Sequence, residues 1–159
     1  MDLRPEQEAG LRSAEVAGGT LLLVLNNTLT AVEDGRNEIL RHLGPLDPLV
    51  RNRLEVLFEE LVSNTIRHGF AKHSAQSIHV QVKRTPGAVE LTFEDDGVPF
   101  NLLEAQPPEP FTSIETARVG GLGIPLIVKM ASALRYERPA PTSCTGFRPS
   151  NRTIISIAT

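Results

Sequence analysis

Residues 47–69 read DPLVRNRLEVLFEELVSNTIRHG, and this stretch predicts the clearest helix of the chain. Asp47 is a good N-cap residue, and Pro48 suits the first helical position, where its missing N–H is not needed. Gly69 is placed to end the helix. The apolar residues between them recur every three or four positions, as on the buried face of a helix: Val50, Leu54, Leu57, Phe58, Leu61 and Ile66.

The same helix carries polar side chains at the border of its apolar face. Glu60 and Asn64 lie four residues apart, and His68 continues their stripe. A carboxylate in this position can act as a general base, and an amide oxygen one turn further suits Mg²⁺. Taken alone, the pattern also fits a helix with an ordinary solvated side.

Two alternating stretches after this helix predict an antiparallel hairpin. Apolar and polar residues alternate over 78–82 and again over 89–93. Between them Pro86 and Gly87 occupy the two central positions of a type II turn. One face of the hairpin is therefore expected to be buried.

The second hairpin strand ends in Glu94-Asp95-Asp96-Gly97. A carboxylate fixed at Asp95 can accept a hydrogen bond from an exocyclic amine such as that of adenine. Gly97, which has no side chain, would let the backbone approach a flat ring closely. An Asp-Gly turn without a ligand is the alternative reading of these residues.

A long proline-rich stretch, residues 96–120, has no sustained period and is typical of a functional lid. It leads through Gly120-Gly121-Leu122-Gly123 into a helix expected from about 124 to 134. Backbone N–H groups at such a helix start can cradle phosphate, although a flexible hinge explains the glycines equally well. Residues 85–117 contain seven acidic and no basic residues, so Arg118 is a candidate for pairing with phosphate.

Length and charge narrow the class of protein. The chain has 159 residues, the size of one domain, and its net charge of −3 argues against a general nucleic-acid binder. No apolar run approaches the roughly 20 residues that span a bilayer. The single cysteine, Cys144, excludes an internal disulfide framework, and the chain is expected to be cytoplasmic.

The remaining segments complete an α+β domain. Residues 1–19 are expected to form a loose N-terminal arm, and 20–159 the domain itself. Within it we expect a strand at 20–25, a helix over about 28–43, and final strands at 134–138 and 153–157. These elements predict an antiparallel sheet with helices on one face.

The order of the motifs resembles the GHKL ATPase and kinase superfamily. The sequence runs Glu60-x-x-x-Asn64-x-x-x-His68-Gly69-Phe70, then Asp95-x-Gly97-x-Pro99-Phe100, then the lid, then Gly121-Leu122-Gly123. Within the superfamily it is most similar to bacterial anti-sigma-factor serine/threonine kinases, in which Asn151-Arg152 before the last strand is also typical. The resemblance covers roughly residues 20–159.

This resemblance implies a Bergerat-type two-layer α/β sandwich, with a mixed, mostly antiparallel sheet, that binds ATP and Mg²⁺. Glu60 would be the base that activates the attacking hydroxyl, and Asn64 would hold the Mg²⁺. Asp95 would accept from the adenine amine. The further nucleotide-binding candidates are Gly97 near the base, Gly121, Leu122 and Gly123 on the phosphate side, and His68 and Arg118; residues 102–119 would form the ATP lid.

The implied function is phosphorylation of a Ser or Thr on an anti-anti-sigma-type partner protein, together with binding of a sigma factor or similar regulator. Because relatives of this kind are often homodimers, the resemblance also implies a homodimer as an expectation. The alternative is a non-catalytic switch in which the nucleotide sets affinity for a partner. A free-standing histidine-kinase-like ATPase domain is a third reading, and against it no helix pair bearing a phosphoacceptor histidine is visible.

Overall fold

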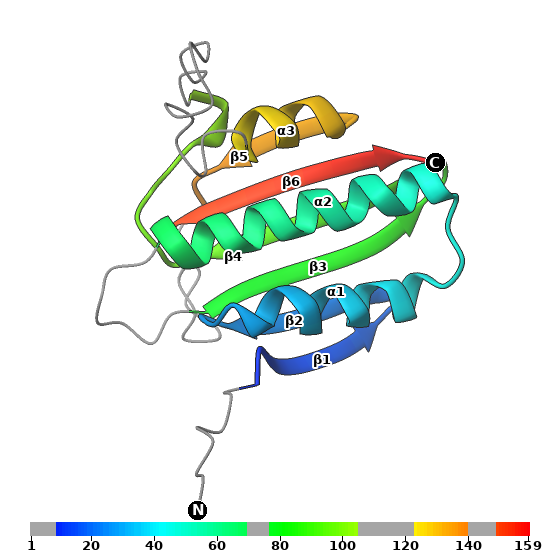
Figure 1. Cartoon of the computed structure of the whole chain (residues 1–159), viewed down its shortest axis with the longest axis horizontal. Coiled ribbons are helices and arrows are strands. Elements are labelled where there is room, and N and C mark those ends of the chain that lie inside the picture. Colours follow the sequence, from blue (N-terminus) through cyan, green and yellow to red (C-terminus); the bar gives the residue numbers. More distant parts are fainter. Residues whose placement is uncertain (1–8, 70–76, 105–122, 140–148) are drawn as a thin grey trace, which may run out of the picture.

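The computed structural model describes residues 9–69, 77–104, 123–139 and 149–159. Within them six strands form one sheet in the order β1-β2-β3-β4-β6-β5, and every neighbouring pair is antiparallel (Figure 1). The described sheet is therefore fully antiparallel rather than mixed. The strands are β1 (Leu11–Ala17), β2 (Thr20–Asn26), β3 (Ser77–Thr85), β4 (Ala88–Asp95), β5 (Ala133–Glu137) and β6 (Asn151–Ala158).

The helices cover one face of this sheet (Figure 1). They are α1 (Thr30–Leu43), α2 (Pro48–Asn64) and α3 (Gly123–Met130), with a π-helical turn at Thr65–Gly69 and a 3₁₀ turn at Leu102–Glu104. None of the helices in the described part of the chain is long and apolar enough to cross a membrane. The expected α+β architecture is confirmed, with two layers that meet along one apolar surface.

The core lies between these two layers. Alternate residues of the strands turn toward the helices, so that Val89, Leu91 and Phe93 of β4 are buried. The ring of Phe93 lies against that of Phe58 on α2, with centroids 6.0 Å apart. Gly35 lets α1 approach closely here, because a Cβ at this position would lie 2.6 Å from the Phe58 ring.

The sequence correctly predicted where several helices and strands begin or end. The Asp47 side chain accepts a hydrogen bond from the Leu49 N–H at 2.9 Å and caps α2, as expected. Gly87 has a φ of 82°, as the third residue of a type II turn requires. The hairpin of β3 and β4 is confirmed with Thr85 paired to Ala88.

The N-terminal arm expected over residues 1–19 is wrong for its last part, since residues 11–17 form edge strand β1. Gly18 and Gly19 have φ values of 57° and 81°, so they make a tight turn into β2 rather than a flexible end. Two consecutive residues with positive φ are the signature of a type I′ hairpin, which favours Gly-Gly.

The last helix is shorter than expected. It ends at Met130, and Ala133, expected in the helix, begins β5 opposite Ser156. The Ser132 N–H donates to the Ser156 carbonyl at 2.8 Å, which turns the chain into the sheet. Of the expected lid at 102–119, residues 102–104 form the 3₁₀ turn and the rest lies outside the described residues.

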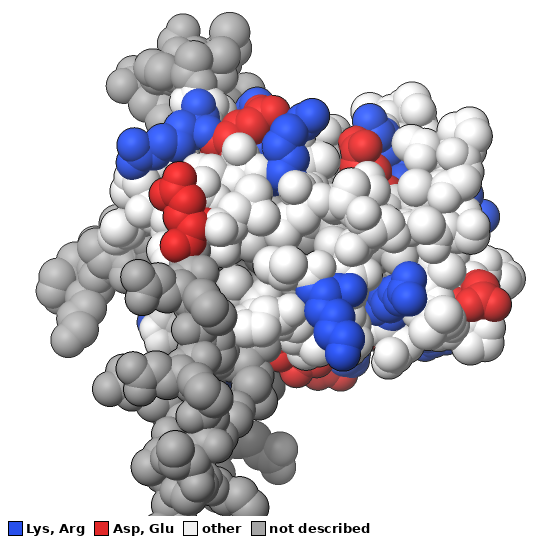
Figure 2. Space-filling model, turned by 90° about the horizontal axis from the view of Figure 1, so that it is seen from above, with Lys and Arg blue, Asp and Glu red and all other residues white. Residues whose placement is uncertain are grey.

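The other face of the sheet carries ion pairs between neighbouring strands. Lys83 pairs with Glu90, and Arg152 pairs with both Glu94 and Glu137. Glu90 and Glu94 therefore face away from the helices, although their sequence position had placed them in one acidic stretch with Asp95. In the view of Figure 2, Lys and Arg are interspersed with acidic and uncharged residues rather than forming one basic surface.

Candidate functional site

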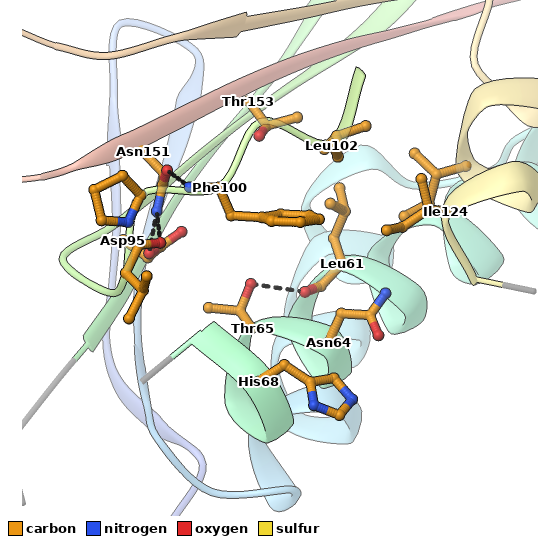
Figure 3. Close-up of a pocket in the computed structure, with 13 residues that line it drawn as sticks. Leu61, Asn64, Thr65, His68, Asp95, Phe100, Leu102, Ile124, Asn151 and Thr153 are labelled. Carbon is orange, nitrogen blue, oxygen red and sulfur yellow. Dashed lines mark hydrogen bonds between the residues drawn. The ribbon is translucent and has the colours of Figure 1, made fainter. Parts of the chain in front are cut away.

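A pocket with a volume of about 370 Å³ opens where the end of α2, the ends of β4 and β6, and the start of α3 converge (Figure 3). Its wall is mostly apolar, with a few polar groups at its edges. The lining residues are Leu61, Asn64, Thr65, His68, Asp95, Val98, Pro99, Phe100, Leu102, Ile124, Ile127, Asn151 and Thr153. An apolar cleft with a few convergent polar groups is the usual form of a small-molecule site.

The end of α2 forms one side of the pocket. After Asn64 the helix passes into the π-helical turn, and the Thr65 hydroxyl donates to the Leu61 carbonyl at 2.9 Å. Single π-turns of this kind are frequent at functional sites, because the extra residue in the turn changes the direction of the side chains that follow. The turn includes His68, which lines the pocket from an exposed position.

The start of α3 lies directly against polar side chains of α2. A Cβ built on Gly123 would be 2.5 Å from Oε2 of Glu60 and 3.0 Å from Nδ2 of Asn64. The Glu60 carboxylate and the Asn64 amide thus meet the first turn of α3 at one point. Glu60 does not itself line the pocket but stands behind Asn64 at this junction.

Asp95 provides the carboxylate of the pocket, at the end of β4. Its Oδ1 accepts a hydrogen bond from the Gly97 N–H at 2.9 Å. The same oxygen accepts one from Nδ2 of Asn151 at 3.0 Å (Figure 3). Burial raises the pKa of the Asp95 carboxyl above its ordinary value, although these two hydrogen bonds lower it; the charge of Asp96 raises it further. Both hydrogen bonds described for this carboxylate converge on one oxygen.

The structure brings together most of the residues selected from the sequence. Asn64, His68 and Asp95 line the pocket, and Glu60 and Gly123 meet beside it. Gly97 is buried next to Asp95, outside the pocket wall. The three other candidates, Arg118, Gly121 and Leu122, lie outside the described residues.

Sequence reasoning missed two groups at this site. Asn151 was noticed only as a typical residue before the last strand, yet its amide contacts Asp95 and the 98–100 segment. Phe100, quoted only as part of a motif, places its ring in the pocket between α2 and α3 (Figure 3). No local sequence signal indicated the contact of Asn151 with Asp95, because it depends on the pairing of β4 with β6.

Asn64 offers the pocket an amide oxygen that a divalent metal can use as a ligand. Among the described residues no three His, Cys, Asp or Glu side chains are grouped in a way that would hold a metal ion. Mg²⁺ requires few protein ligands when phosphate oxygens complete its shell. One amide oxygen beside an open pocket therefore fits a metal brought in with a phosphorylated ligand, and does not fit a metal held by protein alone.

Comparison with known proteins identifies the domain. The family model of the histidine kinase-like ATPase domain matches residues 25–146, more than half of the chain. The chain belongs to this family. The expected GHKL fold is thereby confirmed, and membership of an ATPase domain family implies that the domain binds a nucleotide.

Two individual proteins are similar to this family member. The serine/threonine-protein kinase BtrW of Bordetella bronchiseptica is 28% identical over 89 residues, which are 56% of this chain and 63% of BtrW. The chain therefore matches less than two thirds of that relative. The histidine kinase domain of the blue-light activated histidine kinase from Erythrobacter litoralis EL346 is 15% identical, with a TM-score of 0.49 over 91% of this chain and 66% of that one.

Proposed function

We propose that the protein binds ATP in this pocket and transfers the γ-phosphoryl group to a Ser or Thr of a partner protein, as a regulatory anti-sigma-factor kinase. The observation that carries the proposal is the meeting of Glu60, Asn64 and Gly123 at the pocket, with Asp95 on its other side. The membership of the ATPase domain family and the similarity to a named serine/threonine kinase support it.

Asp95 would hold the adenine base. Its carboxylate has one oxygen occupied by Asn151 and the Gly97 N–H, and the other oxygen remains to accept from the 6-amino group. The apolar wall that includes Leu61, Phe100 and Ile127 offers flat contact to the purine. Gly97, buried beside Asp95, donates its N–H to this carboxylate and so helps to hold it in place.

Asn64 and the start of α3 would hold the phosphates. Backbone N–H groups at the first turn of α3 attract anions, and His68 lines the same side of the pocket. Gly121, Leu122 and Arg118, which lie outside the described residues, are assigned to the phosphates from the order of the sequence motifs. Bound through Asn64, Mg²⁺ would neutralise charge on the phosphates.

Glu60 would accept the proton of the attacking hydroxyl. Its carboxylate lies at the α3 start, adjacent to Asn64, where the terminal phosphate would meet an incoming side chain. A positioned base contributes roughly 10²–10⁴-fold to rate. A pure binding switch has no use for a carboxylate here, which favours catalysis over the non-catalytic alternative.

The protein partners belong to the same proposal. They are an anti-anti-sigma-type protein as phosphoacceptor and a sigma factor or similar regulator as the second ligand, in the cytoplasm, with the kinase as a homodimer. The similarity to the named kinase BtrW supports a protein acceptor.

Glu60→Gln tests the proposal, with Glu59→Gln as the matched control, since Glu59 is an exposed neighbour on the same helix. Each protein is titrated with ATP and Mg²⁺, then incubated with γ-labelled ATP and a soluble extract of the source organism. Glu60→Gln should bind ATP as the wild type does and lose about 10²–10⁴-fold of transfer, with phosphoserine or phosphothreonine as the wild-type product. Phosphohistidine, or equal transfer by Glu60→Gln, would contradict the assignment. Binding without any transfer would favour the switch.

A further inference from the structure

The side chain of Asn151 uses all of its hydrogen-bonding capacity around the carboxylate of Asp95. Its Nδ2 donates to Oδ1 of Asp95 and to the Val98 carbonyl, both at 3.0 Å. Its Oδ1 accepts from the Phe100 N–H at 2.9 Å and from the Tyr136 hydroxyl at 2.6 Å. Asn151 is itself buried, so each of these bonds replaces one to water.

These partners allow the amide one orientation. Turned over, its oxygen would face the Asp95 carboxylate and the Val98 carbonyl, which are both acceptors. Its NH₂ group would then face the Phe100 N–H, a donor. Two donors hold the amide oxygen and two acceptors hold the amide nitrogen, so the NH₂ group is fixed toward Asp95.

Tyr136 reaches this network from β5 without lining the pocket. The strand β5 pairs only with β6 in the described sheet, and Tyr136 stands opposite Thr153 there. The hydrogen bond from its hydroxyl is the shortest of the four that the Asn151 side chain makes. The Tyr136 hydroxyl therefore acts on the pocket through the Asn151 side chain.

We propose that Asn151, held in orientation by Tyr136, is a positioning residue that keeps one oxygen of Asp95 occupied and the other turned to the ligand, and that it thereby sets a preference for 6-aminopurine over 6-oxopurine nucleotides. The inference rests on the proposed nucleotide-binding function and adds the determinant of base choice. A 6-amino group donates to a carboxylate, whereas a 6-oxo group presents an acceptor to it. A site built around one hydrogen-bond partner rejects an analogue that lacks it by a large factor.

Asp95 discriminates in this way only while it is ionised. A protonated carboxyl can donate to a 6-oxo group, so the preference weakens as Asp95 takes up a proton. The Asn151 hydrogen bond lowers the pKa of Asp95, against the effect of burial, and so extends the pH range of the preference. The other titratable groups nearby are Asp96 on the same segment, His68 across the pocket, Tyr136 on β5, and His79 on β3, whose charge interacts with Asp96.

Asn151→Asp gives the sharpest test because it keeps the shape and replaces the donor by a second carboxyl. Wild type and variant are titrated with ATP and with inosine triphosphate from about pH 8.5 down to about pH 4.5, a range that includes the raised pKa of about 4.7 at which a known carboxyl dyad takes up its shared proton. Wild-type affinity for ATP should stay level or fall as the pH falls. At about pH 8.5 the variant should bind ATP at least about tenfold more weakly than the wild type. It should regain affinity as the pH falls, since a shared proton restores a donor to Asp95. The wild-type titrations serve as the control for any pH effect that arises from His68 or His79 rather than from the substitution.

Two further variants test the same role, and Tyr136→Phe, which removes a single hydroxyl, is the mildest of the three. Asn151→Ala should lower the ratio of ATP to inosine triphosphate affinity by about tenfold. Tyr136→Phe, which keeps the ring, should lower it by a smaller factor. Arg135→Gln, on the exposed neighbouring position of β5, should leave the ratio unchanged.

The outcomes distinguish a failure of the proposed nucleotide site from a failure of the proposed role of Asn151. If the wild type binds neither nucleotide, the proposed function fails. If the wild type prefers ATP but Asn151→Ala and Tyr136→Phe keep the same ratio, the role of Asn151 is overturned while the nucleotide site stands. A variant that loses affinity for both nucleotides equally, with an unchanged pH profile, also overturns the positioning role.

Discussion

Gly123, at the first residue of α3, lies so close to Glu60 that a Cβ on the glycine would stand 2.5 Å from the glutamate Oε2. The same Cβ would be 3.0 Å from the Asn64 side chain. The absence of a side chain on α3 is therefore what lets the carboxylate and the amide of α2 occupy their places beside the pocket.

Gly123→Ala should impair phosphoryl transfer far more than folding. The added methyl meets the mobile end of the Glu60 side chain, which can move at little cost to stability but leaves its position as a base. Transfer should fall by about 10²-fold or more, with a nearly unchanged Tm. Labelled-phosphate transfer and thermal unfolding measure the two effects.

Gly35→Ala is the matched control, since it adds the same methyl on the opposite side of the core. Its Cβ would meet the buried Phe58 ring at 2.6 Å, and overpacking there should cost roughly 1–3 kcal/mol of unfolding free energy. Transfer per folded molecule should stay the same. A larger loss of unfolding free energy in Gly123→Ala than in Gly35→Ala would show that the contact at Gly123 is a packing contact rather than a functional one.

Asn64→Ala should weaken the binding of ATP in the presence of Mg²⁺ and leave metal-free binding nearly unchanged. The amide oxygen is the group at this side of the pocket that suits a hard cation. Calorimetric titrations with Mg²⁺ and with a chelator measure the difference. Asn52→Ala, on an exposed position of the same helix, serves as control. Equal loss with and without Mg²⁺ would place Asn64 in phosphate or helix contacts alone.

Asp95→Asn should stabilise the nucleotide-free protein at neutral pH. Burial raises the pKa of Asp95 in the folded chain, so its contribution to stability is full below the unfolded pKa and is lost as the pH rises through the folded pKa. Asparagine keeps a neutral group at every pH. The Tm of the variant should exceed that of the wild type near pH 7, and the gap should close on acidification.

The same substitution should abolish the thermal stabilisation by ATP, because the acceptor for the base is lost. A variant that is both more stable and inactive is the expected sign of a strained functional residue. A lower Tm at neutral pH would mean that Asp95 stabilises the fold through its charge.

Phe100→Ala should reduce nucleotide affinity by about tenfold with a small effect on stability. The ring is 54% exposed without ligand, so its removal leaves little cavity in the core, but it forms part of the pocket wall. Leu103→Ala is the control, because Leu103 is similarly exposed and does not line the pocket. Equal losses of nucleotide affinity in both variants would show that Phe100 does not contact the nucleotide.

The features that the sequence predicted well depend on residues close together in the chain. The cap at Asp47, the turn at Gly87 and the stripe that places Glu60 and Asn64 on one helix face arise within a few residues. The pair Gly18-Gly19 misled because flexible ends and type I′ turns favour the same residues. Ala133 was expected in the helix, although it begins β5, because a short apolar stretch fits either a helix or a strand.

The contacts of Asn151 could not be predicted in this way. Its partners Asp95, Val98 and Phe100 are 51 to 56 residues away, and they meet it only because β6 inserts between β4 and β5. The order of strands in the sheet, which no local pattern specifies, decides that contact. The motif order predicted the fold of the domain, but the hydrogen bonds that position its carboxylate required the structure.

Calorimetric titration of the full chain with ATP and Mg²⁺ tests the central claim most directly, with Asp95→Asn titrated beside it. We expect saturable binding of one ATP per chain by the wild type and a loss of that binding in the variant, which remains folded. A folded wild type that binds no ATP, or an Asp95→Asn variant that binds it equally well, would contradict the nucleotide site described here.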